Sequence, residues 1–120
     1  MAADRFDAQV RQEPGVAVIE LHGEVNGFAA QALESAYVEA VREQPSSILL
    51  NFAGVTYINS TGIALIVGLM AKARAVNRRV LASDLSDHYQ EIFTITRLSD
   101  FMSIFPDEAS ALSGAAAPAT

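Results

Sequence analysis

The chain of 120 residues contains neither cysteine nor tryptophan. Without cysteine it has no disulfide, no thiol nucleophile and no zinc site built on sulfur. Long apolar stretches are also missing: the longest run of apolar residues and glycine in its body, residues 62–71, is far shorter than the roughly 20 residues of a membrane span. The sequence begins without a recognisable signal peptide. We therefore expect a soluble, cytoplasmic protein with no membrane span.

Basic residues are scarce as well. The chain carries 8 Lys and Arg against 14 Asp and Glu, a formal net charge of −6. Because nucleic-acid binding depends on many cationic contacts to phosphate, we expect no direct DNA or RNA partner and a protein partner instead. Four of the basic residues nevertheless fall close together, at Lys72, Arg74, Arg78 and Arg79. They can supply favourable charge at a helix C-terminus, or they can form an anion-binding patch.

The composition is that of one compact domain. Hydrophobic residues make up 51% of the chain and charged residues 18%, and 120 residues leave no room for a second domain. We place the domain at residues 4–112. Residues 113–120 are rich in Ala and Pro and are expected to form a flexible tail.

The order of the predicted elements favours an α/β fold. Strands at 5–11 and 16–22 flank a Glu13-Pro14-Gly15 turn and predict an opening hairpin. Afterwards the hydrophobic period alternates between that of helices and that of strands. The predicted elements are a helix from Phe28 to near Pro45, a strand at 47–52, a helix at 60–76, a strand at 79–82, a helix after Ser86, a strand at 101–105 and a helical turn through Leu112. This order predicts a single domain with a mixed sheet of about five strands and about four packed helices.

The junction at residues 48–63 is the most informative stretch. An apolar strand passes into a helix that begins with Asn59, Ser60 and Thr61. Free backbone N–H groups and the positive end of the helix dipole favour an anion at such a place, so a phosphate could be accommodated there. The alternative is that Asn59 or Ser60 serves only as the N-cap of the helix.

The helix that follows the junction has two apolar faces. On a helical wheel, one face carries Ile63, Ile66, Val67 and Met70, and the other carries Leu65, Leu69 and Ala73. One face can pack on the sheet. The second face either extends the core against a neighbouring helix or forms a docking surface for a partner.

Three blocks in this order resemble the STAS domain family, and within it the small bacterial anti-sigma factor antagonists. Residues 21–26 are similar to the family's hydrophobic-x-Gly-Glu-hydrophobic-Asp block. Residues 48–62 resemble its strand followed by the Asp-Ser-Ser/Thr-Gly loop, and residues 91–98 resemble its Leu-Phe-x-hydrophobic-x-Gly-Leu block. The sequence departs from these patterns at Asn26 and Asn59, where the family has carboxylates, and at Arg97, where it has glycine.

The resemblance implies a partner-switching role. The unphosphorylated antagonist binds an anti-sigma factor that is also a serine kinase of the GHKL type, and phosphorylation of the serine that matches Ser60 ends the complex. Transcription is thereby regulated indirectly, by a protein that has no cofactor and no catalysis of its own. The partner surface that we predict comprises Asn26, Asn59, Ser60, Thr61, Gly62, Ile63, Leu65 and Leu69.

Two alternatives remain at this stage. The chain could be a constitutive STAS binding module of a transport or signalling complex, with Ser60 unmodified, and it could form a homodimer. An enzyme is a more distant alternative, because the sequence has no paired carboxylates, no Ser-His-Asp spacing and no Walker-type loop. The two histidines offer little for acid–base chemistry or metal binding: His22 lies on the solvated face of its strand, and His88 is isolated.

Overall fold

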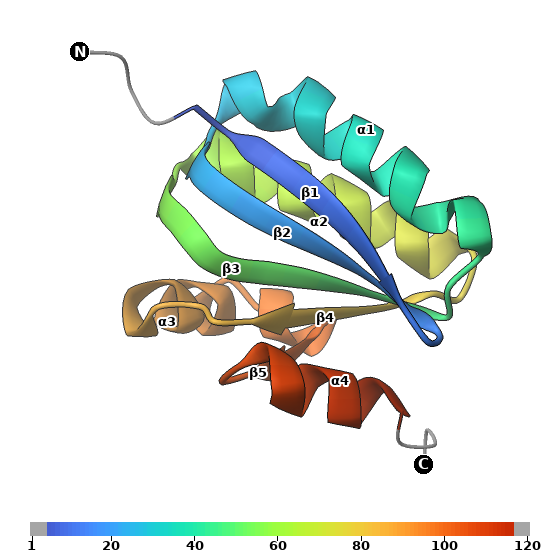
Figure 1. Cartoon of the computed structure of the whole chain (residues 1–120). Coiled ribbons are helices and arrows are strands. Elements are labelled where there is room, and N and C mark those ends of the chain that lie inside the picture. The colour runs from blue at the N-terminus through green and yellow to red at the C-terminus, as the bar shows by residue number, and fades with distance from the viewer. Residues whose placement is uncertain (1–4, 117–120) are drawn as a thin grey trace.

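The structure is a computed structural model that describes residues 5–116, and it contains one five-stranded mixed sheet (Figure 1). The strands lie in the sheet in the order in which they follow along the chain. The first pair is antiparallel and the other neighbouring pairs are parallel. The strands are β1 (Asp7–Glu13), β2 (Val16–Val25), β3 (Ser47–Ile58), β4 (Arg79–Ser83) and β5 (Ser103–Phe105). The predicted hairpin and mixed sheet are confirmed.

Helices cover both faces of this sheet. In Figure 1, α1 and α2 lie together over one face, and α4 lies on the other. Three short 3₁₀ turns connect the regular elements. The helices are α1 (Ala30–Ala40), α2 (Ser60–Ala75), α3 (Asp87–Ile95) and α4 (Glu108–Ala116), and the 3₁₀ turns are η1 (Gly27–Ala29), η2 (Val41–Glu43) and η3 (Leu98–Asp100). Within residues 5–116, none of these helices has the length and apolarity needed to cross a bilayer.

The alternation of side chains along the strands divides the core into two clusters. The larger cluster lies under α1, α2 and α3 and includes Ile19 and Leu50, and Phe93 of α3 packs edge-on against Phe52 there. The smaller cluster lies under α4, where Leu49 belongs to the opposite face of the sheet. Residues 48–50 of β3 are therefore buried on both faces, as their continuous apolar run predicts.

Several elements extend beyond the predicted bounds. β3 continues six residues past Phe52, where it pairs with β2 alone up to the Val25–Ile58 pair. α4 continues through Ala116, and Gly114 lies so close to the Phe105 ring that a Cβ atom would collide with it. The remaining domain boundaries, residue 4 and residues 117–120, lie outside the described part of the chain.

The division of α2 into two apolar faces was wrong in part. Leu69 and Ala73 are buried in the same cluster as Ile66 and Met70, whereas Val67 is 42% exposed. The reason is that α2 packs against the sheet and against α1, so one broad buried stripe serves both contacts. Of the two roles proposed for its second face, packing against a neighbouring helix accounts for Leu69.

A polar cluster fixes α4 to the sheet. The Arg11 guanidinium of β1 donates to the Glu108 carboxylate of α4 at 2.7 Å and to Glu20 of β2 at 3.1 Å. The Asn51 amide of β3 donates to the same Glu108 oxygen at 3.0 Å. The hydrogen bond from Arg11, aided by Asn51, holds the pKa of Glu108 below its ordinary value of 4.5. Because the charged form is favoured in the folded state, Glu108 stabilises the fold above that value.

We predict that Glu108→Gln lowers the free energy of unfolding by about 1 kcal/mol at neutral pH, because it removes one charge from a partly exposed cluster. The difference from the unmodified chain should disappear as the pH falls through the lowered folded-state pKa, where the native carboxyl is itself protonated. Urea denaturation at a series of pH values, from 7 downward through the range in which the folded carboxyl titrates, measures the difference.

Glu34→Gln is the control for this prediction. Glu34 lies 4.0 Å from Lys72 with both side chains exposed, and such pairs contribute little. A loss of stability by Glu108→Gln that stays the same over the whole pH series, including pH values at which the native carboxyl is protonated, would contradict an ionic role for Glu108.

Candidate functional site

The candidate site lies where β3 ends and α2 begins. Asn59 is the N-cap of α2, since its side-chain Oδ1 accepts the backbone N–H of Gly62 at 2.8 Å. Its own backbone N–H donates to the Val25 carbonyl at the end of β2 at 3.2 Å. The strand end before it is fixed as well, because the Ile58 N–H donates to the Tyr89 hydroxyl of α3 at 2.8 Å. Of the two predicted capping residues, Asn59 therefore caps the helix.

Gly62 allows α2 to begin directly against β2. A Cβ atom at this position would lie 1.9 Å from the Val25 carbonyl oxygen, so any other residue would push the helix away from the strand. The same carbonyl accepts the Asn59 N–H. Asn59 and Gly62 thus position the first turn of α2 from both sides, and Ser60 and Thr61 lie between them.

Ser60 and Thr61 are both exposed on this turn. Neither hydroxyl has a hydrogen-bond partner among residues 5–116, and the first turn of α2 carries no acidic residue. Backbone N–H groups at a helix start have no partner within the helix, and the dipole there favours negative charge. The arrangement can therefore present a nucleophilic hydroxyl to another protein and can accommodate a phosphoryl group once it is attached.

The 3₁₀ turn η1 lies beside residues 59–62 at the start of α2, which we call the Ser60 turn. Asn26 caps η1 by accepting the Phe28 N–H at 2.9 Å, and its amide lies 3.4 Å from Glu24. Gly27 lies next to the methyl group of Thr61, since a Cβ atom at Gly27 would be 3.6 Å from it. Asn26, which the sequence analysis placed on the partner surface, is thus brought to the Ser60 turn.

Phe28 is the residue that the sequence analysis missed. It was assigned to the amphipathic helix, but that helix begins at Ala30, and the Phe28 side chain in η1 is 95% exposed. A large apolar side chain this exposed, beside the Ser60 turn, is suited to anchoring a protein partner. The signal in the sequence was Asn26-Gly27, because a capping residue followed by glycine ends the strand and starts a separate turn.

The other predicted partner-surface residues are less accessible. Ile63 is half-buried against the large core cluster, and Leu65 is half-buried where α1 meets α2. Gly62 is buried, and Leu69 is only 5% exposed. The exposed part of the site therefore consists of Ser60, Thr61 and Phe28, and the remaining residues support it from below.

The described part of the chain was also searched for a metal site. No group of three or more His, Asp or Glu side chains within residues 5–116 is placed to hold a metal ion. His22 is exposed on β2 with its Nε2 3.8 Å from a Glu20 oxygen, as expected for a solvated strand residue.

The site and fold can now be compared with known proteins. The sequence is 30% identical over 103 residues to BtrV of Bordetella bronchiseptica, a protein named as a candidate anti-sigma factor antagonist, and the match covers 86% of each chain. An anti-sigma factor antagonist from Mycobacterium paratuberculosis shares the fold with a TM-score of 0.78 and 23% identity, over 95% of this chain and 97% of that one. SpoIIAA of Bacillus in its phosphorylated form gives 0.68 and 23%, over 89% and 97%.

The sequence profile of the STAS domain matches residues 7–111, which is nearly the whole of the described chain. The mixed sheet and its four helices agree with the fold predicted from the order of the elements, and the Asn59–Gly62 turn lies where the second sequence block has a loop after a strand. The chain belongs to the STAS domain family.

Proposed function

We propose that this protein is an anti-sigma factor antagonist that binds an anti-sigma factor with serine kinase activity and is switched by phosphorylation at Ser60. The observation that carries the proposal is that helix capping and the exposed hydroxyl fall on different residues at the start of α2. Asn59 caps the helix, which leaves the Ser60 hydroxyl exposed and without a hydrogen-bond partner in the described chain. In this role the protein is a kinase substrate and a binding partner rather than an enzyme.

The names of proteins similar to this chain support the proposal. BtrV and the anti-sigma-B factor antagonist of Staphylococcus epidermidis, 27% identical over 86 residues, carry names of this class. SpoIIAA, which shares the fold, is described in a phosphorylated form. These names concern those proteins, and we extend them to this chain because the family resemblance matches its exposed Ser60 to the serine that is phosphorylated.

The proposed contact surface combines the Ser60 turn with the neighbouring η1 turn. Ser60 and Thr61 lie at its centre, the exposed Phe28 ring is the apolar anchor, and Asn26 and Asn59 shape the two turns. This surface is supported on its core side by four less accessible residues, Gly62, Ile63, Leu65 and Leu69.

The physical basis of the switch is a difference between folding and binding. A phosphoserine carries about −1.5 to −2 charges at neutral pH. At the start of a helix that charge meets the favourable end of the dipole, worth roughly 0.3–1 kcal/mol at an exposed site, so the fold should tolerate it. A partner packed over Phe28 and Ser60 would have to bury or oppose the same charge, and burying an unpaired charge is costly. Binding is therefore expected to fail while folding survives.

We predict that Ser60→Asp shifts the melting temperature by less than about 4 °C and weakens binding to the cognate anti-sigma factor at least about tenfold. Ser60→Ala should keep the partner and resist phosphorylation. Calorimetry measures binding, and intact-mass analysis after incubation with the kinase and ATP measures modification.

Thr61→Ala is the matched control, because Thr61 is the neighbouring exposed hydroxyl. This variant should still gain one phosphoryl group. If a demonstrated partner kinase leaves the unsubstituted chain unlabelled, or labels Ser60→Ala equally well, the proposed phosphorylation switch is wrong. The alternative, a constitutive binding module, then replaces it.

We predict that Asn59→Asp raises the rate of Ser60 phosphorylation more than about threefold, because a carboxylate beside the hydroxyl can orient it and accept its proton. Asp caps a helix as well as Asn does, so the free energy of unfolding should change by less than about 1 kcal/mol. Initial rates of phosphoryl incorporation and a urea titration measure the two effects. An unchanged rate would show that the carboxylate has no part in the reaction.

We predict that Phe28→Ala weakens partner binding by at least about 2 kcal/mol, roughly thirtyfold, because an exposed aromatic anchor concentrates binding energy. Stability should change by less than about 0.5 kcal/mol, since the 95% exposed ring adds little to the core. Val76→Ala is the control: Val76 is 59% exposed at the opposite end of α2 and should have no effect on either quantity. Unaltered affinity in Phe28→Ala would remove η1 from the contact surface.

A further inference from the structure

We propose that Tyr89 of α3 is a positioning residue for the Ser60 turn. Its hydroxyl accepts the backbone N–H of Ile58 at 2.8 Å, and Ile58 is the last residue of β3. Through this hydrogen bond, α3 determines how firmly the Ser60 hydroxyl is presented to a kinase. The inference rests on the proposed function only where it concerns the rate of phosphorylation.

The end of β3 lacks a strand neighbour on one side. β3 pairs with β4 only as far as the pair of Asn51 with Ser83, whereas its pairing with β2 continues to the pair of Val25 with Ile58. Among residues 5–116, the outer edge of 53–58 therefore has no adjacent β-strand. Such an edge presents backbone N–H and C=O groups without strand partners. Another element has to hold the strand end from this side.

The helix α3 follows the end of β4 and lies beside this edge (Figure 1). Tyr89 and Phe93 are four residues apart and so lie on the same face of α3. The fully buried Phe93 ring packs edge-on against Phe52, with 5.9 Å between the ring centroids. Tyr89 reaches Ile58 at the end of the same strand. The helix thus contacts β3 at both ends of the stretch that β4 leaves unpaired.

A hydrogen bond, more than close packing, holds the strand end on this side. A cavity of about 140 Å³ lies beside the contact and is lined by Val55, Ile58, Leu85 and Tyr89, among others. Side chains that face a cavity have fewer van der Waals contacts than those packed on all sides. Ile58 is only 4% exposed, so loss of the Tyr89 hydroxyl would leave a buried N–H group without its acceptor.

The backbone before Ser60 is held from two sides. On one side the Asn59 N–H donates to the Val25 carbonyl of β2, and on the other the Ile58 N–H donates to Tyr89. Tyr89 is itself fixed, because its own N–H donates to the side-chain oxygen of Ser86, the N-cap of α3, at 3.3 Å. Phosphoryl transfer depends on an accurately placed acceptor hydroxyl. Loosening the α3 side should therefore slow the reaction at Ser60.

Amide hydrogen exchange of the full chain is the first test. In Tyr89→Phe, which removes only the hydroxyl, the Ile58 amide should exchange at least about tenfold faster. The amide of Leu49, in the buried centre of β3, reports opening of the whole sheet and should change less than about threefold. Tyr37→Phe is the matched control, because it removes a hydroxyl that accepts from Arg78 at 3.4 Å, away from β3. It should leave Ile58 unchanged.

Two results of the exchange experiment would overturn the proposal. One is an acceleration at Ile58 that is no greater than the acceleration at Leu49, because the hydroxyl then stabilises only the whole domain. The other is an equal acceleration at Ile58 in Tyr37→Phe.

Phosphorylation kinetics with a demonstrated partner kinase are the second test. In Tyr89→Phe, kcat for Ser60 should fall at least about fivefold while KM changes less than about twofold. The reason is that the proposed anchor, Phe28, lies on η1, so docking survives although the hydroxyl is less well placed. A purely structural Tyr89 would leave both constants unchanged in the folded variant.

The two tests separate this inference from the proposed function. If the kinase labels Ser60 in the unsubstituted chain and kcat is unaltered in Tyr89→Phe, the positioning role is wrong and the switch stands. If the unsubstituted chain is not labelled, the switch is wrong, and the exchange of the Ile58 amide alone decides whether Tyr89 holds the turn.

Discussion

The close approach of β2 to the start of α2 is the constraint on which the candidate site depends. The Val25 carbonyl accepts the Asn59 N–H, and Gly62 leaves the space that brings the helix against it. Because the strand end and the helix start share this contact, the turn between them has little freedom. The exposed hydroxyls of Ser60 and Thr61 are therefore presented by a rigid frame rather than by a flexible loop. Rigid presentation lowers the entropic cost of docking to a partner.

The same contact links the two turns of the site. Val25 is the last residue of β2, and Asn26 follows it at once as the cap of η1. One strand end thereby positions Ser60 through α2 and Phe28 through η1. The surface that we assign to a protein partner is built from two segments about thirty positions apart in the sequence, which are joined by parallel pairing of β2 with β3.

Much of the fold could be predicted from local patterns. Pro14-Gly15 marks the hairpin turn, and Gly15 has the positive φ that such a turn requires. The extension of β3 to Ile58 could not be predicted in this way. Beyond Asn51 the strand pairs with β2 only, because β4 ends at Ser83, so its side chains are partly exposed and show no continuous apolar run. Tertiary pairing, not local propensity, sets its length.

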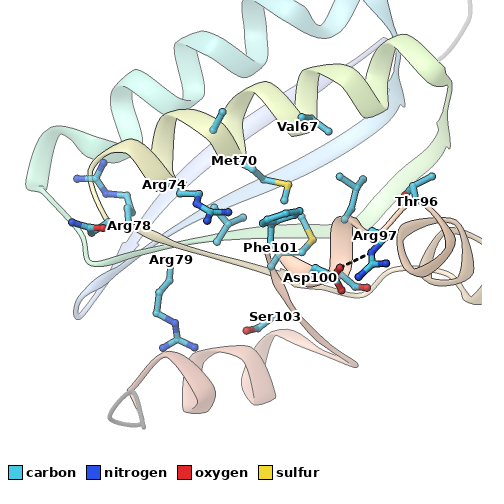
Figure 2. Close-up of a pocket in the computed structure, with 16 residues that line it drawn as sticks. Val67, Met70, Arg74, Arg78, Arg79, Thr96, Arg97, Asp100, Phe101 and Ser103 are labelled. Carbon is cyan, nitrogen blue, oxygen red and sulfur yellow. Dashed lines mark hydrogen bonds and ion pairs between the residues drawn. The ribbon is translucent and has the colours of Figure 1, made fainter.

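The local structure of the candidate site could be predicted at its centre and less well around it. The Asn-Ser-Thr-Gly stretch identifies a helix start from local chemistry alone. The exposure of Phe28 and the burial of Leu69 depend on where α1 packs relative to α2, which a helical wheel does not contain. A groove beside Phe101 (Figure 2) is lined by residues from α2, β4, η3 and β5, which are far apart in the sequence, so no local pattern could indicate it.

The placement of α4 has a consequence for how this domain can be joined to other proteins. Arg11 and Asn51 hold α4 on the sheet face opposite α1 and α2, and Figure 1 shows its end far from the start of α2. A fusion partner or affinity tag attached beyond α4 would therefore leave the Ser60 turn open. Attachment before Arg5 is different, because the Arg5 carbonyl lies against Gly23, three residues before Asn26. Immobilisation through that end would crowd the surface assigned to the partner.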